Sequence, residues 1–197
     1  MSERVKIILD KNADILRLPA IALRGLVVFP GNIIHFEVGR KKSIAAIEWA
    51  MSNNNAVYLT AQQDMDVEDP GFKDLYAYGV VAEVKQVLRV SDELVKVLVE
   101  GKYRAKLLTL DSSGRFLLAS TKAAALRGTK SVDSARVEAL VRSVKEAFEE
   151  YLSLNPRLSK DVVYTIITNE DAALLCDYIP ANLLLKYTDK QALLNEG

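Results

Sequence analysis

Residues 18–40 constrain the fold of this chain more than any other stretch, and they read LPAIALRGLVVFPGNIIHFEVGR. Two apolar runs rich in β-branched residues, Gly25–Phe29 and Asn32–Val38, flank the dipeptide Pro30-Gly31. Proline fixes φ and has no N–H, and glycine tolerates positive φ, so this dipeptide is typical of a tight turn between strands. The stretch therefore predicts two core strands joined at Pro30-Gly31.

Alternation with a period of two continues to about residue 123 and predicts further strands. They are expected at Ala56–Ala61, Gly79–Val90, Leu94–Glu100, Tyr103–Leu110 and Phe116–Ala123. The second and third of these form a hairpin, and Gly101 is expected to break the strand after it. One face of the hairpin's first arm is apolar, and its members are Val80, Ala82, Val84, Leu88 and Val90.

The pattern changes near Arg127, where the strand signals cease. Ser134–Leu152 has an apolar stripe at helical spacing over about five turns. Ser159 and Asn169 are expected to cap two further helices, and a capping-box pattern at residues 188–191 opens a last one. The sequence therefore predicts an α+β fold with a β-rich unit over residues 1–124 and a helical unit over residues 125–197.

The charge balance and the cysteine content limit the classes of function. Lys plus Arg and Asp plus Glu number 26 each, so no long-range field recruits a polyanion. No apolar run approaches the ~18 residues of a membrane span, and the amino terminus lacks a signal-peptide pattern. The single cysteine, Cys176, cannot form an intrachain disulfide and is expected to be a buried structural thiol in a reducing cytoplasm.

Motifs for catalysis and for metal binding are missing from the sequence. It contains no P-loop, no Gly-x-Ser-x-Gly elbow, no histidine-based triad and no Cys/His cluster with zinc spacing. The acidic stretch Gln63–Asp74 lacks the glycine and glutamate positions of a calcium loop, so it is interpreted as a solvated loop. We therefore predict no catalytic residue, metal site or cofactor within this chain.

Several short motifs resemble the opening of the amino-terminal domain of Lon proteases, in that family's order and spacing. They are Leu18-Pro19, Leu23-Arg24, Val27–Pro30, Val38–Arg40 and Lys42-Ser43, followed by Tyr78–Val80 and Val99–Gly101. The sequence differs at Ala22 and His35, positions where family members often carry proline. Each change restores a backbone N–H, so strand pairing there is expected to differ slightly.

The resemblance implies both a fold and a setting for the chain. The β-rich unit would be a PUA-like pseudo-barrel, and the helices would belong to a carboxy-terminal helical bundle. In that family, a segment that resembles Asp189–Gln191 and Leu193-Leu194 leads into a long helix towards an ATPase module. The chain is thus expected to be a fragment of a cytoplasmic homo-hexameric protease, whose ATP, Mg and Ser–Lys dyad belong to later modules.

The implied function is to bind unfolded or damaged proteins through exposed apolar surface and to support assembly. Candidate substrate-binding residues are apolar and lie next to turns: Phe29, Pro30, Leu88 and Val90. Burial in the barrel core explains Phe29 and Val90 at least as well, whereas exposure is favoured for Pro30 and Leu88. Three residues of the family motif, Arg24, Gly39 and Arg40, are interpreted as structural, because a strand exit needs glycine and arginine bonds loop carbonyls.

A stand-alone RNA-binding module is the alternative, because similar small β-barrels serve that purpose. The neutral charge balance opposes it, as does the lack of interleaved aromatic and basic residues on the predicted strands. Salt would discriminate between the two functions. RNA binding weakens steeply as ionic strength rises, whereas apolar capture of unfolded protein does not.

Overall fold

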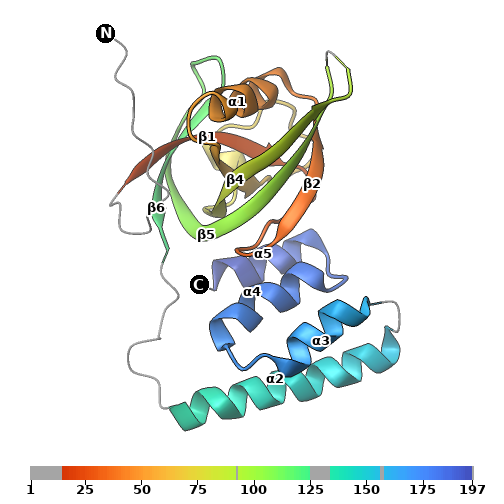
Figure 1. Ribbon diagram of the computed structural model, residues 1–197. Helices are drawn as coiled ribbons and strands as arrows, with labels where there is room; N and C mark the ends of the chain where they lie inside the picture. The colour runs from red at the N-terminus through yellow and green to blue at the C-terminus, as the bar shows by residue number, and fades with distance from the viewer. Residues whose placement is uncertain (1–14, 92, 125–133, 156–157, 197) are drawn as a thin grey trace.

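The computed structural model describes residues 15–91, 93–124, 134–155 and 158–196, and it has a mixed α+β fold (Figure 1). A β-sheet core comes first, and four helices follow it. The six strands are β1 (Leu16–Leu23), β2 (Ile33–Val38), β3 (Ala56–Ala61), β4 (Tyr78–Arg89), β5 (Val95–Asp111) and β6 (Leu117–Ala123). The proposed unit boundary at 124/125 stays a prediction, because residues 125–133 lie outside the described part.

The strands form one sheet that closes on itself. Their order is β2-β5-β4-β3-β1-β6, and β6 pairs with β5 as well as with β1. The 17-residue strand β5 makes this possible, because its first half pairs with β2 and its second half with β6. Five strands therefore make a closed ring, and β2 is an additional strand whose second edge has no partner strand among the described residues.

The parallel pair β1 and β3 requires a crossover connection, which carries helix α1 (Lys41–Met51). Its small apolar residues turn inwards, and Ala46 and Ala50 are both fully buried. Strand β3 is buried along its whole length, because it lies between two strands and has its outer face covered. Tyr58 at its centre donates its hydroxyl to the carbonyl of Ala105 at 3.2 Å, and burial raises the pKa of that phenol.

Two predictions about the strands are wrong. Residues 25–29 form no strand, because Gly25 has a φ of +63° and turns the chain out of the ladder after β1. Gly101 does not break β5, which continues through it. A Cβ there would lie 2.2 Å from the carbonyl oxygen of Phe29, so this glycine permits close approach of two backbones.

The hairpin of β4 and β5 is present as predicted, but its apolar face is interrupted by a β-bulge. Val84 pairs with Val99, and Gln86, two residues later, pairs with Leu98, so Lys85 is the additional residue. A one-residue insertion reverses the side-chain alternation beyond it. Val87 consequently packs against the core, and Leu88 faces outwards with 58% of its surface exposed.

The helices that follow are α2 (Ser134–Leu154), α3 (Lys160–Thr168), α4 (Ala172–Asn182) and α5 (Tyr187–Asn195). They share an apolar cluster centred on Val141, Phe148, Ile166 and Leu175. The Ser159 side chain caps α3 as predicted, whereas α4 is capped by Asp171 and not by Asn169. Pro180 lies inside α4.

A polar joint and an apolar cluster hold the helices against the barrel. In Figure 1, α5 lies nearest to the barrel and α2 farthest from it. Arg104 of β5 donates to Asp177 of α4 and to the carbonyl of Leu194 in α5. Beside it, Leu194 packs into an apolar cluster with Val80 and Phe29 of the barrel half. The β half and the helical half thus share buried contacts.

Candidate functional site

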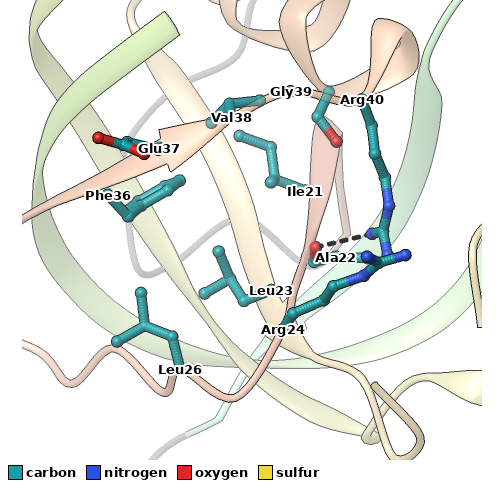
Figure 2. Close-up of a pocket in the computed structure, with 11 residues that line it drawn as sticks. Ile21, Ala22, Leu23, Arg24, Leu26, Phe36, Glu37, Val38, Gly39 and Arg40 are labelled. Atoms are coloured by element: carbon teal, nitrogen blue, oxygen red, sulfur yellow. Dashed lines mark hydrogen bonds between the residues drawn. The ribbon is translucent and has the colours of Figure 1, made fainter. Parts of the chain in front are cut away.

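An apolar pocket lies where the barrel half is not closed by strand pairing (Figure 2). Strand β6 pairs with β1 only over Leu16–Ala20, so the end of β1 has no strand on that side in the described structure. Strand β2 faces this end across a cavity of about 320 Å³. Its apolar lining comes from both sides, with Ile21, Leu23 and Leu26 on one and Phe36 and Val38 on the other.

Arginine side chains close one end of this pocket. Arg40 donates to the carbonyl of Ala22 at 3.2 Å, to Gln62 Oε1 at 2.5 Å and to the carbonyl of Val67 at 3.2 Å. Arg24 donates to the same Val67 carbonyl at 3.3 Å. Burial lowers the pKa of the Arg40 guanidinium, and the neighbouring Arg24 charge lowers it further. These contacts are of the kind expected from a structural arginine, and that role remains a prediction.

Gln62 organises the loop that the arginines bind, and sequence reasoning missed it. It is fully buried, and its Nε2 donates to the carbonyls of Asp64 and Val67 at 3.0 and 2.9 Å. Lys42 also holds the loop, through Asp69 at 3.0 Å. A single glutamine after a strand gives no sequence signal for this role, because its partners come from a distant arginine and a local loop. Among the described residues, no three His, Cys, Asp or Glu side chains lie together in an arrangement that could bind a metal.

The predicted substrate-binding residues do not gather at one place. Leu88 and Val90 are 58% and 56% exposed at the tip of the β4–β5 hairpin, near Val95. Pro30 is half-buried and lies beside the middle of β5, near Gly101. The distance from Val95 to Gly101 is roughly 20 Å at about 3.4 Å per residue of extended strand. The hairpin tip and the Pro30 turn are therefore separate surfaces.

Phe29 is wrong as an exposed candidate, because it has no exposed surface. Its ring belongs to the cluster with Val27, Val80 and Leu194, between the barrel and α5. The prediction of a buried thiol is also wrong, because Cys176 is exposed. It follows Leu175, which points into the helical cluster, so Cys176 lies on an outer face of α4.

An outward apolar stripe crosses the three strands beside the hairpin tip. Leu88 lies opposite Lys96 and diagonal to Leu98, and Ile33 of β2 lies diagonal to Leu98 on its other side. Ile33 is 62% exposed and Leu98 is half-buried. We call Leu88, Leu98 and Ile33 the outer stripe. Sequence alternation alone did not reveal it, because the bulge at Lys85 decides which face Leu88 occupies.

Nearly the whole chain matches a known protein family. Residues 17–197 match the family model described as the ATP-dependent protease La (LON) substrate-binding domain. The chain belongs to this family. Curated Lon proteases from several bacteria are similar to this chain. The Lon protease of Desulforamulus reducens is 38% identical over 183 residues, and that of Escherichia coli K12 is 36% identical over 184 residues.

Each of these alignments covers 93% of this chain but only 22% and 23% of the two relatives. The chain thus spans less than a quarter of the length of the Lon proteases it matches. A solved structure, the N-terminal domain of Lon protease from the Mycobacterium avium complex, has the same fold with a TM-score of 0.65 at 17% identity. That match covers 92% of this chain and 97% of the other. No described helix is both long and apolar enough to cross a membrane.

Proposed function

We propose that this chain is the non-catalytic amino-terminal domain of an ATP-dependent Lon serine protease and that it binds unfolded or damaged proteins. The observation that carries this proposal is the outer stripe, an exposed apolar surface in a domain whose family is described as substrate-binding. Unfolded chains differ from native ones in their exposed apolar side chains. The free energy of burying such side chains scales with area and not with sequence, so an apolar surface suits many substrates.

The geometry of the stripe supports weak and reversible contact. The bulge at Lys85 turns Leu88 outwards, and cross-strand pairing places Leu98 and Ile33 beside it. Ionic pairs border the stripe, since Lys85 and Lys102 each bridge Glu83 and Glu100 at 2.7–2.9 Å. Such a rim is typical of surfaces whose apolar centre makes the contact. Val90 extends the apolar surface at the hairpin tip.

The wider setting is part of the proposal. The β half would be a PUA-like pseudo-barrel, the helices would be the first part of a helical bundle, and ATPase and protease modules would follow in the same chain. ATP and Mg would bind to the ATPase module, and six copies would assemble in the cytoplasm. The match to about a fifth of each Lon protease supports this, because it leaves room for such modules.

The test is to replace Leu88 with serine and to measure binding of a heat-unfolded protein together with the melting temperature. Binding should weaken while the melting temperature stays nearly unchanged, because a substitution of an exposed side chain alters stability by about 0.5 kcal/mol or less. Leu184→Ser is the matched control, since Leu184 is 76% exposed between α4 and α5, away from the stripe. Equal binding by both variants and the parent would refute a role for the stripe, and a large fall in melting temperature would make Leu88 a structural residue.

A further inference from the structure

Strand β2 is an edge strand, and the backbone N–H and C=O groups on its outer edge have no partner strand in the described structure. It pairs with β5 on one side only, in an antiparallel ladder from Ile33–Glu100 to Val38–Val95. Natural edge strands are commonly blocked by proline, lysine or a bulge. None of these interrupts β2, whose sequence is IIHFEV and whose register is regular. Its free edge is therefore able to accept another strand.

The ladder identifies which groups face the free edge. The Gly101 N–H donates to the carbonyl of Asn32, directly before β2. Because antiparallel ladders alternate, Ile34 and Phe36 then direct their backbone groups towards β5, and the intervening residues direct theirs outwards. His35 and Glu37 are thus the central residues with backbone groups at the free edge. No backbone bond of either is recorded outside the strand ladder in the described structure.

The space beside this edge leads into the apolar pocket. Phe36 and Val38 line the pocket from β2, while Ile21 and Leu23 line it from the end of β1 (Figure 2). The free edge thus faces a cavity with a second wall and not open solvent. A folded partner that paired its own edge strand with β2 would push the rest of its sheet against the end of β1. A single extended chain has no attached sheet and needs only the space between β2 and β1.

We propose that an extended segment of an unfolded polypeptide adds to the free edge of β2 as a further strand and places an apolar side chain in the pocket. This inference rests on the proposed function and specifies the site and the mode of binding. Alternate side chains of a strand point to opposite faces. One set would enter the pocket beside Phe36, and the other would lie on the outer face next to Ile33, continuous with the outer stripe.

This mode explains how one site serves many sequences. The bonds to His35 and Glu37 are made by the backbone, which every unfolded protein carries and which a native protein has already paired. The pocket then selects segments with an apolar side chain at every second position. Native proteins rarely present both features together on their surface, so the site favours unfolded over folded chains without reading a sequence.

The experiment uses a synthetic peptide of alternating leucine and serine and the same peptide methylated at every second backbone nitrogen. Methylation removes donors and keeps the side chains, so the methylated peptide should bind at least about tenfold more weakly. In the protein, His35→Pro removes the outward N–H and should weaken binding of the parent peptide roughly two- to tenfold. His35→Ala, the matched control, keeps that N–H and should bind as the parent does.

Amide hydrogen exchange gives a second measurement that needs no variant. Peptide binding should slow exchange at His35 and Glu37, while Ile34 and Phe36 should change little because β5 already protects them. Equal affinity for the two peptides, or unchanged exchange at His35 and Glu37, would overturn strand addition. If a heat-unfolded protein still bound in that case, the proposed function would stand.

Two further outcomes also decide against the inference. If neither the peptide nor the heat-unfolded protein binds to the parent chain, the proposed function fails together with it. If sedimentation shows a dimer that His35→Pro dissociates, the edge is occupied by a second copy of the chain and not by unfolded polypeptide.

Discussion

The joint between barrel and helices gives the sharpest prediction about stability. Arg104 is only 5% exposed, and its guanidinium donates to Asp177 Oδ1 from both Nε and Nη2 and to the Leu194 carbonyl from Nη1 at 3.3 Å. Arg104→Met keeps an unbranched apolar stem of similar length and removes all of these donors. The Asp177 side chain is 13% exposed, so in the variant its carboxylate is largely buried without the guanidinium that pairs with it.

We expect this substitution to lower the free energy of unfolding by about 3 kcal/mol near neutral pH, the range found when one member of a buried ion pair is removed. The loss should depend on pH. Burial raises the pKa of the Asp177 carboxyl, and the bonds from Arg104 oppose that rise. Without Arg104 the folded-state pKa rises further above the unfolded value. The cost is then fully present where the carboxyl is ionised in the folded protein. It decreases as the pH falls below the folded-state pKa and the carboxyl takes up a proton, and it is gone below the unfolded-state pKa.

Urea denaturation near neutral pH and at about pH 5 measures both effects, with the deficit of the variant expected to be smaller at the lower pH. Arg115→Met is the control, because Arg115 and its partner Glu48 are 80% and 43% exposed and surface pairs contribute about 0–1 kcal/mol. A loss below about 1 kcal/mol for Arg104→Met, or an equal loss at both pH values, would contradict a joint held by this ion pair.

Three further predictions concern Arg40, Gly101 and Cys176. Arg40→Ala should lower the free energy of unfolding by about 2 kcal/mol, because three acceptors lose a charged donor. Arg24→Ala should lower it less, because Arg24 donates to one of these acceptors only. Unchanged stability of Arg40→Ala together with lost substrate binding would contradict the structural role. Gly101→Ala should strongly reduce the melting temperature, whereas Gly114→Ala, with its nearest contact at 3.7 Å, should not, and equal melting curves would refute the close approach at Gly101. Cys176 should react with iodoacetamide in the native protein, more slowly than a free thiol because burial raises its pKa, and full protection by mass spectrometry would show that it is covered.

Local patterns predicted much of the fold because the pattern and the packing agree there. Ala56–Ala61 is a strand at the predicted bounds, and the β4–β5 hairpin and the helix from Ser134 are also present. A period of two or 3.6 residues marks each of these elements. Burial follows the pattern only in part, because β3 is buried on both faces and Leu88 and Val90 at the end of the predicted β4 face are exposed. The family resemblance was confirmed by the family model over residues 17–197.

The errors arise where a distant backbone decides a local conformation. Gly101 was interpreted as a strand breaker, but the chain at Phe29 passes so close that only glycine fits in a continuing strand. The local sequence left Phe29 open between an exposed turn and the core, and α5, more than 150 residues later, covers it. The bulge at Lys85 likewise depends on cross-strand register. No short window of sequence contains both Gly101 and Phe29, or both Phe29 and α5.

The pairing of β6 with both β1 and β5 has a consequence for how the chain is made. The Thr121 hydroxyl donates to the carbonyl of Leu16 across 105 positions of sequence, so the ring closes only after nearly the whole β half has been synthesised. Non-local strand pairs form slowly. Until β6 leaves the ribosome, β1 and the second half of β5 each present an unpaired edge, which is a hazard for aggregation. A domain proposed to hold unfolded proteins is thus itself a chain that needs protection while it is being translated.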